Sequence, residues 1–151
     1  MDYEDVEILF AEDTVDDATL TMRALRKSGI TNKIHHVEDG AEALDFMYCL
    51  GIYSTRNIQR NPKLILLDLK MPKKSGIQVI ERIKADPNFR QIPVVVLTSS
   101  KEDLDIKQCY ALGINSYIVK PVDSNNFFQS LKSLGVYWMI LNRQSDPGIQ
   151  A

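Results

Sequence analysis

The chain alternates short apolar runs with longer segments in which apolar residues recur at helical spacing. Short, branched apolar runs are typical of strands buried on both faces, whereas a spacing of three to four residues is typical of helices. The predicted strands span 6–11, 32–38, 63–68, 92–97 and 114–119. The predicted helices span 14–28, 39–50, 75–86, 101–112 and 123–141. Strict alternation predicts a doubly wound (βα)5 α/β fold, a five-stranded parallel sheet with right-handed crossovers and helices on both faces.

Several predicted helices carry start and stop signals. Ser75 is a predicted helix cap, and Pro87 ends that helix because the residue before a proline avoids helical angles. Gly29 and Gly113 follow helices as stops, and Gly40 suits a turn into a helix. These signals support the element boundaries.

Polar residues stand where the predicted buried strands end. Asp68 closes the apolar run 64–67, and Glu12 and Asp13 follow the first strand. Thr98 follows the fourth strand and Lys120 the fifth. Open parallel sheets bind ligands at the carboxyl ends of their strands, so we expect these side chains to converge there. A buried carboxylate needs a cation or hydrogen-bond donors, and this edge would supply them.

Taken together, these motifs resemble the receiver domain of two-component response regulators, the CheY-like fold. The motifs are Glu12-Asp13, Asp68 with Met71-Pro72 and Gly76, Thr98, and Lys120-Pro121. The resemblance covers about 6–141 and implies one receiver domain over 1–151, with a short tail at 142–151. It also implies the flavodoxin-like strand order 2-1-3-4-5.

A narrower resemblance is to the stand-alone regulators paired with phytochrome kinases. It rests on the inserted segment around 52–61, the Pro121-Val122-Asp123 sequence and the aromatic pair Tyr137-Trp138. The resemblance therefore implies a histidine kinase as partner, with a phytochrome-type kinase as its narrower form.

The site chemistry follows from the residue types. An aspartate carboxylate, ionised at neutral pH, can attack phosphorus and form an acyl phosphate, so Asp68 is the expected phosphoacceptor. Glu12 and Asp13 would repel it unless a hard cation such as Mg²⁺ lay between them. Lys120 and Thr98 would donate to the phosphoryl oxygens. We therefore expect a protein that catalyses its own phosphotransfer and dephosphorylation rather than an enzyme acting on other substrates.

The family pattern implies further roles. Asp13, Asp68 and the Lys70 carbonyl would ligate Mg²⁺ directly, and Glu12 would act through a bound water. Thr98 and Tyr117 would form a switch that reshapes the face of helix four, strand five and helix five. The remaining implied roles are phosphate-lifetime tuning by Lys70 and Ser100, and a cis peptide bond before Pro121.

Composition limits the other possibilities. With 151 residues, 44% hydrophobic and 25% charged, the chain suits one soluble domain with a substantial core. A net charge of −2 disfavours a nucleic-acid surface. We also expect no secretory signal and no membrane span. Cys49 and Cys109 are isolated, which favours reduced thiols and a cytoplasmic location.

Alternatives stay open at this stage. Each polar residue alone has a simpler explanation, such as a helix cap at Thr98 or half-buried packing at Tyr117. His35 and His36 are adjacent in a strand and point to opposite faces, which disfavours a shared metal.

The excess of apolar residues near the end of the final helix favours a homodimer. The main alternative function is a phosphorylation-independent binding module. A flavodoxin-like enzyme or mononucleotide binder is weaker, because no glycine-rich loop follows strand one.

Overall fold

The computed structural model of the chain describes residues 3, 5–99 and 103–135. One sheet of five parallel strands has the order β2-β1-β3-β4-β5. Its strands are β1 (Ile8–Ala11), β2 (Ile34–Val37), β3 (Leu64–Asp68), β4 (Val94–Thr98) and β5 (Ser116–Val119). The predicted doubly wound fold and strand order are confirmed.

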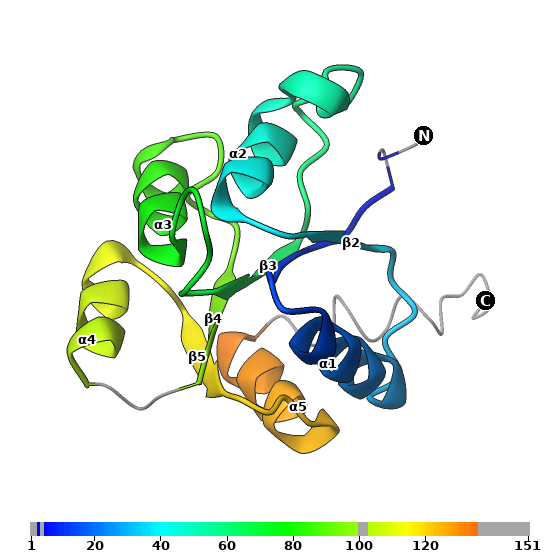
Figure 1. Ribbon diagram of the computed structural model, residues 1–151, viewed down its shortest axis with the longest axis vertical. Helices are drawn as coiled ribbons and strands as arrows, with labels where there is room; N and C mark the ends of the chain where they lie inside the picture. Colours follow the sequence, from blue (N-terminus) through cyan, green and yellow to red (C-terminus); the bar gives the residue numbers. More distant parts are fainter. Residues whose placement is uncertain (1–2, 4, 100–102, 136–151) are drawn as a thin grey trace.

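Helices cover both faces of this sheet. They are α1 (Val15–Lys27), α2 (Gly40–Tyr48), α3 (Gly76–Ala85), α4 (Asp103–Leu112) and α5 (Ser124–Leu134), with a short 3-10 helix η1 (Gly51–Tyr53). Helices α1 and α5 lie on one side, and α2, α3 and α4 lie on the other (Figure 1).

The two cores follow from the period of a strand, in which alternate side chains point to opposite faces. In β1, Leu9 and Ala11 join the core beneath α2 and α3, whereas Ile8 and Phe10 join the core beneath α1 and α5. All four side chains are fully buried. Burial on both faces explains why β1, β3 and β4 are continuous apolar runs instead of alternating ones.

The final helix differs from its prediction. Helix α5 ends at Leu134, and Gly135 follows it in the left-handed conformation with φ 71°. The expected single helix over 123–141 is therefore wrong at Gly135. Glycine favours this conformation because it has no Cβ, so Gly135 carries the same stop signal that Gly29 and Gly113 carry. Residues 136–141, with the aromatic pair Tyr137-Trp138, lie outside the described residues.

Capping fixes the start of α3 as predicted. The Ser75 hydroxyl accepts from the Gln78 N–H at 3.3 Å, and the Gln78 side chain accepts from the Ser75 N–H at 2.9 Å. This reciprocal pair is a capping box, which satisfies two backbone donors at the helix N-terminus. The capping box fixes the end of the loop between β3 and α3, and this loop follows the predicted phosphoacceptor Asp68.

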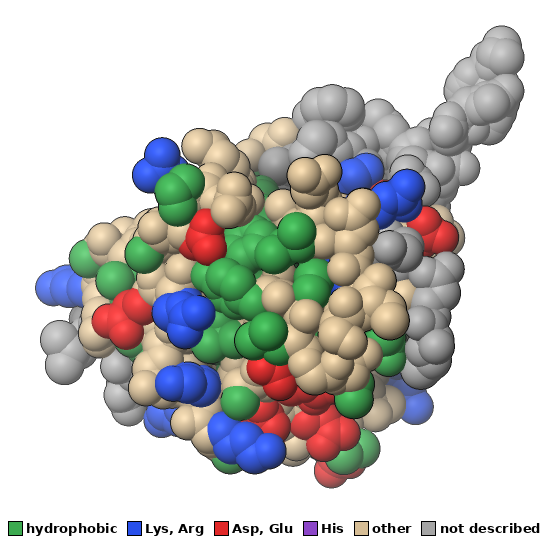
Figure 2. Space-filling view, turned by 90° about the horizontal axis from the view of Figure 1, so that it is seen from above, with side chains coloured by type: hydrophobic (Ala, Val, Ile, Leu, Met, Phe, Trp, Pro, Cys, Tyr) green, Lys and Arg blue, Asp and Glu red, His purple; other side chains and the backbone are tan. Residues whose placement is uncertain are grey.

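The inserted segment between α2 and β3 is held by Arg56, which is buried. Its guanidinium donates to the carbonyl oxygens of Phe46 and Arg60 at 2.6 and 2.7 Å. Because the segment joins the end of α2 to the start of β3, it lies away from the carboxyl ends of the strands. Figure 2 looks onto the end of the molecule where α2 and η1 lie, and hydrophobic side chains gather near its centre. Three exposed hydrophobic side chains belong to this segment: Leu50, Ile52 and Ile58.

The N-terminus of α2 packs tightly against the β3–α3 loop, and Gly40 is the point of closest approach. A Cβ atom at Gly40 would overlap the Lys74 carbonyl group. Alanine normally favours a helix over glycine by about 1 kcal/mol. We nevertheless expect Gly40→Ala to lower the free energy of unfolding by about 1 to 3 kcal/mol, because the loop must move. Urea denaturation measures this effect. Unchanged or increased stability would show that the loop gives way at no cost.

Candidate functional site

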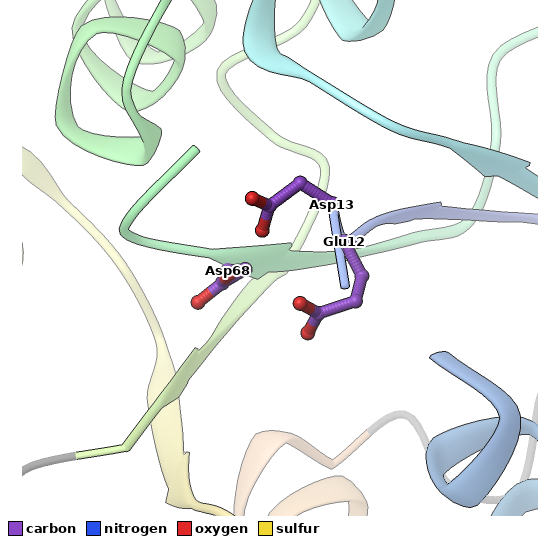
Figure 3. A group of neighbouring side chains, drawn as sticks. All are labelled: Glu12, Asp13 and Asp68. Atoms are coloured by element: carbon purple, nitrogen blue, oxygen red, sulfur yellow. The ribbon is translucent and has the colours of Figure 1, made fainter. Parts of the chain in front are cut away.

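Four strands deliver polar side chains to one edge of the sheet. Asp68 is the last residue of β3 and Thr98 the last of β4. Glu12 and Asp13 follow β1, and Lys120 follows β5. The parallel register aligns these strand ends, as Asp68 pairs with Leu97 one residue before Thr98. Figure 3 shows the three acidic side chains gathered at the end of β3.

The three acids form a compact cluster. Carboxylate oxygens of Glu12, Asp13 and Asp68 lie within 4.8 Å of one another. The Glu12 side chain is fully buried and that of Asp68 nearly so, whereas Asp13 is exposed. Two buried carboxylates this close repel each other unless positive charge is nearby. The structure thus brings together the acids that the sequence places at the strand ends.

Lys120 supplies that positive charge. Its Nζ lies 2.8 Å from Glu12 Oε1, 3.0 Å from Asp17 Oδ2 and 3.4 Å from Asp68 Oδ1. Burial alone lowers the pKa of Lys120, but hydrogen bonds to Glu12 and Asp17 and the charge of Asp68 outweigh burial and raise it. Lys120 therefore remains a cation at neutral pH and is shared among three acids.

Asp68 is the most perturbed acid of the site. Burial and the nearby charge of Glu12 outweigh the attraction of Lys120 and raise the pKa of Asp68 to about 6. At neutral pH the carboxylate is therefore mostly ionised, and its charge is poorly compensated. Such a group gains from a ligand or covalent partner that brings positive charge or hydrogen-bond donors.

This raised pKa predicts a pH-dependent stability. The folded state binds the Asp68 proton more tightly than the unfolded state, whose pKa is near the ordinary 3.8. At pH 8 without metal, we expect Asp68→Asn to be more stable than the unmodified protein by about 1 to 3 kcal/mol. The difference should shrink as the pH falls through about 6 and vanish near 4. Urea denaturation in EDTA across this range measures it, and a difference independent of pH would contradict the prediction.

The cluster suits a hard divalent cation. Its ligands are carboxylate oxygens, which Mg²⁺ and similar ions prefer. Glu12 Oε1 is buried and lies 2.8 Å from the Lys120 ammonium. Because a carboxylate oxygen has more than one lone pair, Glu12 could also accept a hydrogen bond from a metal-bound water. Lys70, whose carbonyl is a predicted ligand, is exposed two residues beyond Asp68.

The predicted switch residues lie on neighbouring strands. Thr98 is buried, and its carbonyl oxygen accepts from the Lys120 N–H at 2.8 Å. Tyr117 on the edge strand β5 is 38% exposed, and its ring meets Tyr110 of α4 edge to face at 6.2 Å. The Lys120–Pro121 peptide bond is cis. Ser100, a predicted tuning residue, lies outside the described residues.

The two adjacent histidines point to opposite faces, as expected. His36 Nε2 lies 2.7 Å from the Glu12 carbonyl oxygen, whereas His35 Nε2 lies 2.8 Å from the Tyr53 hydroxyl oxygen. The His35 ring also stacks on Phe46. The histidines therefore share no ligand, and each has a structural partner.

Asp17 is a site residue that the sequence pattern does not identify. It lies in the first turn of α1, yet its carboxylate reaches Lys120, 103 residues later in the chain. Its sequence signal is its place in the acidic segment 12–17, which leads from the first strand into the first helix. Nothing local to that segment identifies a lysine partner.

Comparisons with known proteins agree with this geometry. Residues 8–132 match the family described as response regulator receiver domain. FilR2 of Methanothrix harundinacea, described as a probable methanogenesis regulatory protein, is 37% identical over 140 residues, which are 93% of this chain and 88% of FilR2. No helix within the described residues is long and apolar enough to cross a membrane.

Two solved structures are similar over most of their length. The bacteriophytochrome response regulator RtBRR is 42% identical with a TM-score of 0.83, covering 91% of this chain and 82% of RtBRR. The Mn²⁺-bound form of response regulator Rcp1, a protein of Synechocystis, is 34% identical with a TM-score of 0.72. The alignment with the Rcp1 structure covers 94% of this chain and 99% of Rcp1.

Proposed function

The chain belongs to the response regulator receiver family, and we propose that it accepts a phosphoryl group from a histidine kinase onto Asp68. The observation that carries the proposal is the nearly buried ammonium of Lys120, set against the carboxylates of Glu12 and Asp68 at the carboxyl edge of the sheet. This constellation has a nucleophile, a cation and a set of hard-metal ligands in one place.

The proposed transfer is a simple displacement. A carboxylate oxygen of Asp68 attacks the phosphorus atom of a kinase phosphohistidine, and the P–N bond breaks. Its electron pair stays on the imidazole nitrogen, which takes up a proton from solvent. In the later hydrolysis, water attacks phosphorus, the P–O bond to Asp68 breaks, and the carboxylate and inorganic phosphate are released. No external base is needed, because Asp68 is mostly ionised at neutral pH.

Each neighbouring group has a proposed role. Lys120 neutralises one phosphoryl oxygen, and the Thr98 hydroxyl donates to another. Mg²⁺ is the proposed metal, held by Asp13, Asp68 and the Lys70 carbonyl, with Glu12 acting through water. When bound, the metal offsets negative charge that develops during transfer. Lys70 and Ser100 tune the lifetime of the phosphoryl group.

The proposed output is a changed protein interface. Thr98 moves toward the phosphoryl group, and Tyr117 turns inward behind it, which shifts a two-state equilibrium of the α4, β5 and α5 face. The exposure of Tyr110 and Tyr117 on this face supports a role in contacts. We propose that the same face forms a homodimer.

We further propose that the kinase is of the phytochrome type. The support is the likeness to RtBRR, a bacteriophytochrome response regulator. FilR2 is comparably similar and bears a different description, so the kinase must be identified by experiment. Phosphotransfer from purified candidate kinases would decide between them.

Labelling with a small phosphoryl donor tests the proposal. Purified protein is incubated with acetyl phosphate, with Mg²⁺ or with EDTA, and its intact mass and oligomeric size are followed. The expected result is a Mg²⁺-dependent adduct of one phosphoryl group, with a linked change in size if dimerisation is the output. Retained Mg²⁺ affinity without any adduct would favour a phosphorylation-independent binding module instead.

A further inference from the structure

Lys120 has one more partner than the proposed phosphotransfer uses. In addition to Glu12 and Asp68, its ammonium contacts Asp17 Oδ2 at 3.0 Å, which is shorter than the 3.4 Å contact with Asp68 Oδ1. The Asp17 side chain is 39% exposed, whereas that of Lys120 is 12% exposed. Asp17 therefore approaches the nearly buried lysine from the solvent side. Unlike Glu12 and Asp68, which end or follow strands, Asp17 belongs to helix α1.

We propose that Asp17 is a positioning residue that retains the Lys120 ammonium in the unphosphorylated protein and gives it up when Asp68 is phosphorylated. This inference rests on the proposed function, because a phosphoryl group on Asp68 is the ligand that draws the lysine away. In this proposal Asp17 competes with the phosphoryl group for the Lys120 ammonium, and helix α1 thereby becomes sensitive to phosphorylation.

The physical basis is competition for the position of one ammonium group. In the resting state three carboxylates share the single ammonium of Lys120. A phosphoryl group adds charge and strong acceptor oxygens at Asp68, so its attraction for Lys120 exceeds that of a half-exposed carboxylate. Lys120 cannot face both groups equally well, and the contact with Asp17 weakens as the contact with the phosphoryl group forms.

Competition acts in both directions, because coupling between two sites is reciprocal. If phosphorylation loosens the bond between Asp17 and Lys120, any change that loosens this bond favours phosphorylation. Asp17 lies in the first turn of α1, so a partner that engages this turn would release the lysine. The contact thereby couples the surface of α1 to the reactivity of Asp68.

The test compares two charge-neutral variants of adjacent residues. Asp17→Asn removes the competitor, whereas Asp16→Asn removes the same charge from the same helical turn at an exposed position. Both remove one negative charge from the first turn of α1, where the helix dipole favours it. Relative to Asp16→Asn, we expect Asp17→Asn to raise the initial rate of Mg²⁺-dependent labelling by acetyl phosphate about 1.5- to 5-fold. Asp17→Glu, which keeps the charge, should return the rate toward that of the unmodified protein.

A second measurement separates positioning from a purely structural role. In a double-mutant cycle, Asp17→Asn is combined with Lys120→Met, and unfolding of metal-free protein is measured for all four forms. We expect Asp17→Asn to lower the midpoint of urea unfolding more in the presence of Lys120 than in the Lys120→Met background, where only the smaller loss of its interaction with the helix dipole remains. An equal effect in both backgrounds would show that Asp17 does not act through Lys120.

The outcomes distinguish the two proposals. If the unmodified protein is labelled and Asp17→Asn is no faster than Asp16→Asn, the retention role is overturned and the proposed function stands. If the unmodified protein is never labelled, the proposed function fails, and the retention role fails with it. Faster labelling of Asp17→Asn together with a non-zero coupling to Lys120 supports both.

Discussion

Replacing Asp68 with asparagine is expected to abolish labelling by acetyl phosphate while the protein remains folded. The amide has no ionised oxygen to attack phosphorus, and the other buried carboxylate beside Lys120, that of Glu12, has no exposed surface. The expected loss is complete within the sensitivity of intact-mass measurement. Because a neutral amide at this position would relieve the repulsion from Glu12, the variant should also unfold at a higher urea concentration.

A matched aspartate variant controls for this experiment. Asp16→Asn removes a carboxylate that is exposed in the first turn of α1, and it should keep the adduct. Circular dichroism verifies that both variants are folded. A full adduct on Asp68→Asn would place the phosphoacceptor elsewhere, and peptide mapping of the modified residue would then identify it.

The second large effect is expected from Lys120→Met in metal-free protein. Removing the ammonium leaves the fully buried Glu12 and the nearly buried Asp68 without their cation. Loss of one partner of a buried ion pair is strongly destabilising, so we expect the free energy of unfolding to fall by about 3 kcal/mol or more. Mg²⁺ should restore part of this loss, because a divalent cation at the same edge also neutralises the carboxylates. Urea denaturation with Mg²⁺ and with EDTA measures both effects.

Lys63→Met is the matched control for the lysine variant. Lys63 also pairs with a nearly buried glutamate, at 3.0 Å from Oε2 of Glu7 just before β1, but the lysine side chain is 40% exposed. Partly exposed ion pairs contribute little, so the expected loss is below about 1 kcal/mol. Mg²⁺ should not change it. Equal losses for the two lysines, both insensitive to Mg²⁺, would rule out a special electrostatic role for Lys120.

Much of the fold could be predicted because its pattern is local. Residues 64–67 form a continuous apolar run, which identifies a strand buried on both faces without knowledge of its neighbours. Alternation of such runs with helical segments then restricts the sheet to a parallel, doubly wound form. The family resemblance supplied the strand order, which the pattern alone does not specify. The end of α5 was missed because the apolar spacing beyond Gly135 outweighed the glycine signal.

The acidic cluster could be predicted for a related reason. Each acid directly ends or follows a strand, so its position along the sheet edge is set by the strand itself. Asp17 and Arg56 could not be predicted in this way. Asp17 reaches Lys120 only because α1 packs beside α5 and the loop after β5. Arg56 is buried because its loop packs against α2, where the guanidinium contacts Phe46.

The succession of strands and helices and the buried apolar faces follow from local patterns in the chain. So does the edge of the sheet that carries Glu12, Asp13, Asp68, Thr98 and Lys120. These features depend on side-chain periodicity and on the common direction of parallel strands. The packing of the whole chain sets how the charge of Lys120 is divided among Glu12, Asp17 and Asp68, and how far the pKa of Asp68 is raised. Ion-pair distances and pKa values depend on the burial and separation of groups far apart in the chain, and these arise only when the helices pack on the sheet.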